Sequence, residues 1–508
     1  MKLTRRSFIQ TGGAAMAGTM VLPPLLSSCK NLQLSADVKN YLDHFEVTPE
    51  MLQKVLARAM SKGADYADLF FEHKISNTLA LEDGKVNRAY SNVDYGMGIR
   101  VLKGDQTGFA YTETTHEADM LKVATTAANI ANDPVTFKQD DLLEKVPPNY
   151  YKIDRKWEDA SVEDKIPFVQ RINDRVFELD EKVTKVSASL SDESSYVMFY
   201  NSDGRISYDY RPMANFRVRC VMEKNGQIEN AGSSRSFRKG FEWLGDDIIE
   251  EIANEAVERT NILFGAIKPV AGEMPVVLGA GGSGILLHEA MGHAFEADFN
   301  RKGTSIFSEK MGKSVAKNFI NIAEDGTIEN NRGSINIDDE GNDVKKTYLV
   351  KDGILENYIH DRISAKFYGV EASGNGRRES FRHAPMPRMR ITYMDPGPHS
   401  KDDIVSAVDY GVYVDNFSNG QVNIGAGDFT FFVKSGYLIE NGKLTQPIKD
   451  INIIGNGPQA LADITMAAGD YKTDNGTWMC GKNGQSVPVT MGLPTVLVSK
   501  LTVGGTNA

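Results

Sequence analysis

The stretch Gly281-Gly-Ser-Gly-Ile-Leu-Leu-His-Glu-Ala-Met-Gly-His293 places two histidines, His288 and His293, close to a glutamate, Glu289. The chain has only 8 histidines in 508 residues, so a chance arrangement of this kind is rare. Two imidazoles and a carboxylate this close can hold a metal ion beside a general base. On a regular helix, however, histidines at this spacing point about 140° apart and could not share one ion. The stretch therefore predicts a helix distorted by a π-type turn or by unwinding at Gly292.

A metal at these histidines needs a third ligand, because a catalytic zinc takes three protein ligands and leaves one position open. Glu296 and Asp298 are the candidates nearby in the sequence, and Cys480, in the glycine-rich segment 476–485, is the distant one. Cys480 is the first choice, since the chain has only 3 cysteines and a thiolate with imidazoles favours zinc. Glu289 is then the candidate general base. The alternative interpretation is a buried core helix whose histidines serve packing alone.

Beyond this motif, the chain resembles the TldD/PmbA family of metalloproteases, and within it the TldD branch. That branch carries the His-Glu-x-x-x-His motif, which the PmbA (TldE) branch lacks. The resemblance rests on segments throughout the second half of the chain and, more weakly, on two in the first half, namely 298–303, 332–334, 338–341, 374–380, 385–389, 480–485 and 502–505, with 64–72 and 96–101.

The resemblance implies a zinc peptidase that hydrolyses short or unfolded peptides. It implies that His288, His293 and Cys480 hold the zinc and that Glu289 activates the attacking water. It also implies a homodimer, or a heterodimer with a PmbA (TldE)-type paralogue.

Two further functions fit the same residues. One is a non-catalytic peptide-binding subunit of a TldD/PmbA-type complex, and the other is a zinc amidohydrolase that acts on a non-peptide amide. Retention of the ligands and of the base favours catalysis over the first of these. A dinucleotide-binding loop is disfavoured, because Gly279-x-Gly281-x-x-Gly284 has the fingerprint spacing but lacks the second apolar strand downstream.

Arg377 and Arg378 are candidate substrate-binding residues. They lie in the polar, glycine-flanked loop 374–380, the kind of segment that often carries binding residues. A guanidinium group binds a carboxylate through two parallel hydrogen bonds. We therefore expect these arginines to bind a substrate carboxylate, the alternative being a structural or solvated role.

The N-terminus is typical of an export signal. Thr4-Arg-Arg-Ser-Phe-Ile-Gln10 is followed by an apolar run rich in glycine and alanine, which indicates the twin-arginine route. Leu26-Ser-Ser-Cys29 resembles a bacterial lipoprotein cleavage box, so we expect a lipidated Cys29, the alternative being simple cleavage nearby. The predicted location is the periplasm or a membrane surface. A lipid anchor would be the membrane contact, because later segments lack the roughly 20 apolar residues of a membrane span.

Charge and cysteine content limit the kinds of partner and of covalent bond that we expect. The formal net charge of −11 disfavours a nucleic-acid partner. With Cys29 in the signal and Cys480 at the metal, Cys220 remains, and it alternates with apolar residues as on the inward face of a strand. No disulfide is therefore expected.

The pattern of elements predicts an α+β fold. We expect a signal at 1–29, an N-terminal domain at 30–265 with antiparallel sheets, helices, the substrate groove and dimer contacts, and a catalytic domain at 266–508. The last domain is expected to be a β-rich barrel or sandwich that carries the metal-binding helix, since glycine turns dominate it.

Local signals place the N-terminal elements. Helices are expected from Thr48, from a capping box at Thr114 and Glu117, from Ser161, and over 246–262. Short strands are expected at 67–73, 77–82, 85–90, 96–102, 106–111, 184–191, 195–200, 205–211 and 215–223.

Overall fold

The structure of the chain is a computed structural model that describes residues 34–133, 135–137, 142–423 and 425–505. The predicted signal 1–29, with Cys29, lies outside these residues. The described part has an α+β fold with two domains, as the sequence predicts. The boundaries drawn at 29/30 and 265/266 remain predictions.

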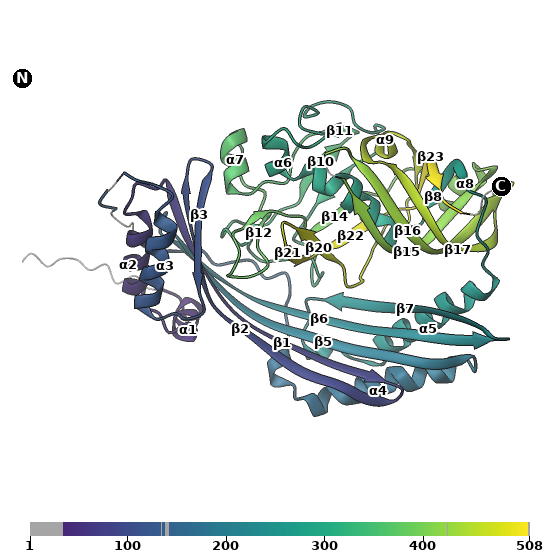
Figure 1. Cartoon of the computed structure of the whole chain (residues 1–508), viewed down its shortest axis with the longest axis horizontal. Helices are drawn as coiled ribbons and strands as arrows, with labels where there is room; N and C mark the ends of the chain where they lie inside the picture. The colour runs from purple at the N-terminus through teal and green to yellow at the C-terminus, as the bar shows by residue number, and fades with distance from the viewer. Residues whose placement is uncertain (1–33, 134, 138–141, 424, 506–508) are drawn as a thin grey trace, which may run out of the picture. The chain divides into compact units, whose positions relative to one another are not determined.

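The N-terminal domain is built on one large sheet of long strands (Figure 1). The strand order is β3-β2-β1-β5-β6, and both β4 and β7 pair with β6. The helices are α1 (Ala36–His44), α2 (Pro49–Met60), α3 (Glu117–Ala128), α4 (Val162–Leu179) and α5 (Asp246–Asn261). The strands are β1 (Tyr66–Glu82), β2 (Lys85–Lys103), β3 (Gln106–Thr112), β4 (Leu143–Glu144), β5 (Val183–Asn201), β6 (Arg205–Lys224) and β7 (Gln227–Phe237).

The short strands expected in this domain are parts of longer ones. The runs at 67–73 and 77–82 are both in β1, which pairs with β2 from Tyr66↔Leu102 to Glu82↔Lys85. The ladder continues through the polar residues between the runs because backbone pairing does not require apolar side chains. Asp83 and Gly84 both have positive φ at the hairpin turn, as a tight connection between two strands requires.

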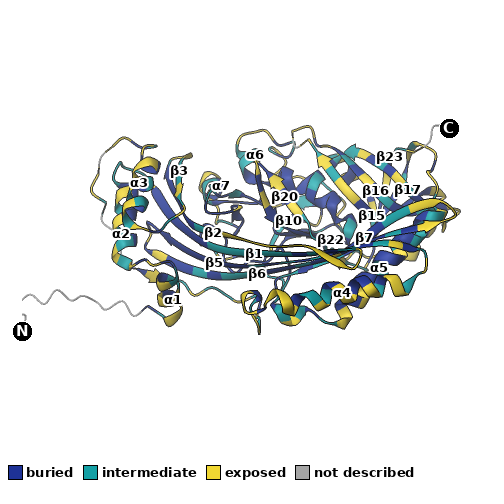
Figure 2. Cartoon of the chain, turned by 60° about the horizontal axis from the view of Figure 1, so that its bottom comes forward, coloured by how far each residue is buried: buried dark blue, intermediate teal, exposed yellow. Residues whose placement is uncertain are grey.

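The two faces of the long sheet differ in character. One face packs its apolar residues, including Leu190, Phe216 and Val218, against α4 and α5. Figure 2 shows the buried sides of these helices turned toward the sheet. The opposite face carries small and polar side chains such as Ser189 and Ser191, which are half-buried. The polar face contacts the C-terminal domain, for example where the Arg332 guanidinium donates to the side-chain oxygens of Asn215 and Ser236.

The C-terminal domain contains a closed set of strands. In its main sheet the order is β17-β16-β15-β8-β23-β18, and β17 also pairs with β23, which closes a barrel, one of the two architectures that the sequence predicts. These strands are β8 (Gly272–Leu278), β15 (Tyr410–Val422), β16 (Asp428–Glu440), β17 (Lys443–Asn456), β18 (Ile464–Ala467) and β23 (Val496–Val503).

A second sheet of this domain has the order β11-β10-β9-β14-β22-β19. Its strands are β9 (Ile322–Glu324), β10 (Thr347–Lys351), β11 (Ile354–Leu355), β14 (Ile391–Met394), β19 (Lys472–Thr473) and β22 (Thr490–Leu493). The described part of the domain also has two pairs of short strands and four short α-helices, with further helical turns between β8 and α6. These elements are β12 (Gly376–Arg377) with β13 (Met386–Pro387), β20 (Met479–Lys482) with β21 (Gln485–Pro488), and α6 (Ala297–Arg301), α7 (Arg362–Tyr368), α8 (Lys401–Ser406) and α9 (Gly457–Ala462).

Buried ion pairs join the two domains. Arg100 on β2 pairs with Asp68 on β1 and with Glu340 of the C-terminal domain, and all three side chains are fully buried. Arg211 on β6 bonds Asp339 at 2.7 Å. Because an unpaired buried charge is costly, these contacts tie the two domains together.

Helix starts follow local chemistry in most places. The Thr48 side chain caps α2, and Ser161 caps α4 in a full capping box. The capping box expected at Thr114 and Glu117 is wrong, because α3 has His116 as its N-cap without a side-chain bond. Thr114 instead donates to Asp119 at 2.9 Å. Among the described residues, no helix combines the length and apolar character needed to cross a membrane.

Candidate metal centre

His288 lies in a π-helix over Leu287–Gly292, and His293 is the residue that caps its C-terminal end. The N–H of His293 donates to the carbonyl of His288, a bond that spans one residue more than in an α-helix. The wider turn turns the two rings toward each other, with centroids 5.1 Å apart. The predicted distortion is therefore confirmed.

Packing in the core holds this irregular turn in place. Leu287, Ala290 and Met291 belong to one buried cluster with residues of both C-terminal sheets. At Gly292 an added Cβ would lie 2.0 Å from the Met389 sulfur. A larger residue here would have to displace the buried Met389 side chain, which favours glycine.

Cys480 completes a group of three possible metal ligands. The donor atoms of His288, His293 and Cys480 all lie within 4.8 Å of one another, and the three residues are buried. The Cys480 Sγ is 3.5 Å from Nε2 of His293. Nδ1 of His288 is buried and has no hydrogen-bond partner among the described residues. Sulfur and imidazole donors fit a zinc-like ion.

The electrostatics of the group favour a thiolate. Burial alone raises the pKa of the Cys480 thiol, but His288 and His293 lower that pKa well below its usual range. For His293, burial lowers the pKa, whereas Glu296 and Cys480 raise it well above the usual value. A metal ion bound here would replace the proton of His293, because only a thiolate and neutral imidazoles can be ligands.

Glu296 and Asp298, the other candidate ligands, are not part of the three-residue group but contact residues next to it. Glu296 bonds Nδ1 of His293 at 3.1 Å and the Lys482 ammonium at 3.0 Å. Lys482 also pairs with Asp298 at 2.8 Å. Burial raises the pKa of Glu296, but Lys482 and His293 lower it to about 2, so the carboxylate stays charged. This is the arrangement by which outer residues orient a ligating histidine.

Sequence reasoning missed the role of Lys482. Cys480 and Lys482 are the buried residues of β20, two positions apart on one side of the strand. A buried lysine so close to a candidate ligand is a usable signal, but its partners lie 184 and 186 positions away. Lys482 thereby fixes the cysteine hairpin to the histidine segment.

Glu289 lies on the π-helix beside His288 and is half-buried. It has no hydrogen bond or ion pair with any described residue. Such a carboxylate is available to accept a proton from water. Its role as the base stays a prediction.

Arg377 and Arg378 are both buried and bond to the protein. Arg377 donates to the carbonyls of Met389 and Pro488 at 2.6 and 2.8 Å. Arg378 donates to the carbonyl of Asp339 at 2.9 Å and lies over the Phe70 ring. Nε and Nη1 of Arg378 have no partner among the described residues. Substrate binding by these arginines stays a prediction.

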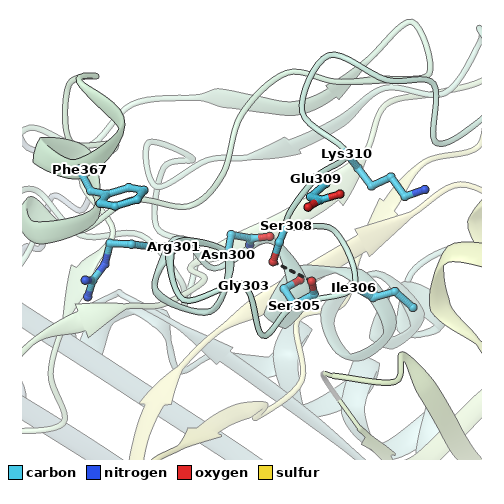
Figure 3. A pocket seen from close by; sticks show the side chains of 9 residues that line it. All are labelled: Asn300, Arg301, Gly303, Ser305, Ile306, Ser308, Glu309, Lys310 and Phe367. Carbon is cyan, nitrogen blue, oxygen red and sulfur yellow. Dashed lines mark hydrogen bonds between the residues drawn. The ribbon is translucent and has the colours of Figure 1, made fainter.

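A pocket of about 500 Å³ lies beside the histidine segment (Figure 3). Its wall includes Asn300 and Ser305, whose side chains donate to the carbonyl of Ala294 at 2.7 and 2.6 Å. In Figure 3 the Ser308 hydroxyl bonds the Ser305 carbonyl. None of the three metal-ligand candidates lines this pocket. Asn300 and Ser305 thus hold the backbone next to His293 from the side of the pocket.

Three family models cover most of the chain. They describe domain 1, the central domain and the C-terminal domain of the PmbA/TldA metallopeptidases and match residues 67–131, 155–264 and 271–505. A metalloprotease TldD homolog of Haemophilus influenzae is 40% identical over 88% of this chain and 94% of its own length. A zinc metalloprotease TldD homolog of Saccharolobus solfataricus is 28% identical over 89% and 99%. The crystal structure of TldE from Thermococcus kodakarensis has the same fold, with a TM-score of 0.68, 20% identity and coverage of 89% and 100%.

The fold and the buried His, His, Cys group define a metallopeptidase. The chain belongs to the PmbA/TldD metallopeptidase family and is similar to its TldD members.

Proposed function

We propose that this metallopeptidase uses zinc to hydrolyse short or unfolded peptides. The convergence of His288, His293 and Cys480 within 4.8 Å carries the proposal. A thiolate with two imidazoles suits zinc better than magnesium or calcium. The relative from Saccharolobus solfataricus is named a zinc metalloprotease, which supports the same ion.

In this proposal the protein residues divide the work. His288, His293 and Cys480 hold the metal, and Glu296 keeps the His293 ring oriented through Nδ1. Zinc, when bound, supplies a Lewis acid that polarises a carbonyl and makes water more acidic. Glu289 takes the proton from the attacking water and delivers it to the leaving amine.

The test combines metal analysis with a peptide library. Wild-type protein is expected to hold one zinc per chain and to cleave peptides, while Glu289→Gln keeps the zinc and loses turnover. Cys480→Ala is expected to lower the zinc content below one per chain. Turnover retained in Glu289→Gln would remove this residue from the mechanism, and full zinc content in Cys480→Ala would remove the third ligand.

Two other functions remain candidates because they use the same residues. A non-catalytic peptide-binding subunit would bind library peptides without cleaving them. A zinc amidohydrolase would cleave acylated amines but leave the peptides intact. The uncommitted carboxylate of Glu289 beside the ligand group favours hydrolysis over simple binding.

The partner is proposed to be a second copy of the chain or a PmbA (TldE)-type paralogue, with dimer contacts and the substrate groove in the domain 30–265. The shared fold with TldE from Thermococcus kodakarensis supports this proposal. Light scattering gives the mass of the assembly in two samples, the protein purified alone and the protein purified after co-expression with the paralogue. A monomer in both samples would contradict the proposal.

Export by the twin-arginine route, with a lipid on Cys29, is proposed from residues 4–29 alone. Replacing Arg5 and Arg6 together by lysine is expected to hold the protein in the cytoplasm. Mass spectrometry of the membrane fraction is expected to find a diacylated Cys29, and Cys29→Ser to release the protein from the membrane.

A further inference from the structure

The polar face of the long sheet meets the loop that leads to Cys480. Asn215 and Arg217 on β6 lie on this face, two positions apart. An Arg217 guanidinium N–H donates to the Thr477 hydroxyl oxygen, three positions before the cysteine. Arg332 donates to the carbonyl of Trp478 at 3.0 Å. A peptide side chain or end group bound here would therefore lie a few peptide residues away from a bond cleaved at the proposed metal.

Arg332 is a buried cation that forms no ion pair with a carboxylate in the described part of the chain. Its side chain is held by neutral acceptors, the Trp478 carbonyl, Asn215 and Ser236, and the residue is 4% exposed. Burial lowers the pKa of Arg332 to about 10, the carboxylate of Glu193 opposes that shift, and the charges of Arg238 and Arg217 add to it. Positive charge thus accumulates at this place without an ion pair.

Arg217 is the exposed member of this group. No carboxylate of a described residue lies within ion-pair distance of it. Asp474, the acidic residue of the neighbouring loop, is held by the Trp478 indole N–H at 2.9 Å and by the Gly476 N–H at 2.7 Å. An accessible guanidinium with a buried positive charge behind it attracts an anion.

We propose that Arg217 and the Thr477 hydroxyl form a subsite for a carboxylate of the substrate peptide, with Arg332 as the buried charge that strengthens it. The carboxylate belongs either to an aspartate or glutamate side chain or to the free carboxyl end of the peptide. This subsite rests on the proposed peptidase function. It makes Arg217 a specificity-determining residue.

The test measures peptide binding to the Glu289→Gln protein, so that cleavage does not interfere. Four peptides are compared that differ at two places only. One internal position is glutamate or glutamine, and the carboxyl end is free or amidated. The peptides with the recognised carboxylate are expected to bind about tenfold more tightly, and added salt should reduce the difference. Arg217→Gln should abolish this preference, and Arg217→Lys should keep part of it.

Arg219→Gln is the matched control. Arg219 lies on the same strand and face and is also exposed. Its guanidinium donates to Asn230 at 2.7 Å and not to the loop before Cys480. Equal binding of all four peptides, or equal loss of preference in Arg219→Gln, would overturn the subsite. The glutamate and end-group arms show which carboxylate is recognised. If wild-type protein cleaves nothing yet the preference depends on Arg217, the peptidase proposal fails and the subsite stands.

Discussion

Lys482→Met should weaken both the metal site and the fold, because Lys482 links the two segments that carry the ligands. Its side chain is 2% exposed, and it pairs with Glu296, which is 0% exposed, at 3.0 Å. Its other partner, Asp298, is 15% exposed and can regain water. Removing one partner of a buried pair costs about 3–5 kcal/mol, so we expect about 3 kcal/mol of unfolding free energy to be lost. Zinc affinity should fall about 10- to 100-fold, as with other outer residues of metal sites.

Two measurements check this prediction. Urea unfolding of metal-free protein gives the loss of stability, and competition with a chelator gives the zinc affinity. Lys443→Met is the control, because Lys443 is exposed at the first position of β17 and forms no ion pair with a described residue. Unchanged affinity and unchanged unfolding free energy in Lys482→Met would refute the linking role.

Gly292→Ala should cost about 1–3 kcal/mol of stability by overpacking the core, since its Cβ would lie 2.0 Å from the Met389 sulfur. Urea unfolding measures the loss, which should shrink when Met389 is also changed to alanine; additive effects would contradict the contact. Arg100→Met should cost about 3–5 kcal/mol because it leaves Asp68 and Glu340 buried without this partner, and an unchanged urea midpoint would be the opposing result. Burial lowers the pKa of His360 from 6.5 to about 4, so its stabilising contribution is present above pH 6.5 and is lost as the pH falls toward 4. Between pH 6.5 and 4, the unfolding free energy of His360→Phe should therefore fall by about 3 kcal/mol less than that of the wild type. His116→Phe, at an exposed position, is the control. If the stability curves of His360→Phe and wild type are parallel over this pH range, His360 is not the cause.

Features that depend on neighbouring residues could be predicted from the sequence. Thr48 and Ser161 start helices because their side chains bond backbone groups within the next turn. The π-turn followed from the spacing of His288 and His293, which no regular helix can reconcile with one ion. The grouping of His288, His293 and Cys480 could be predicted because few residue types bind zinc and this chain has few of them.

Features that depend on distant residues could not be predicted in the same way. The polar centres of β1 and β2 look like breaks between strands, but each is paired along its whole length by another strand. Arg377 and Arg378 look exposed in a polar loop, yet carbonyls of other segments hold them in the interior. Lys482 shows no motif of its own, since its function lies in contacts with Glu296 and Asp298.

The irregular turn and the distant ligand are connected physically. A π-turn has poorer backbone bonding than an α-helix, so it persists only where surrounding packing determines it. Here that packing is supplied by the core around Leu287 and Met291, and by the pair of Glu296 with Lys482. The same pair holds the hairpin of Cys480 in place. Contacts that keep the histidines together thus also deliver the sulfur, so the three ligands can be arranged before any metal arrives and the entropy cost of binding falls.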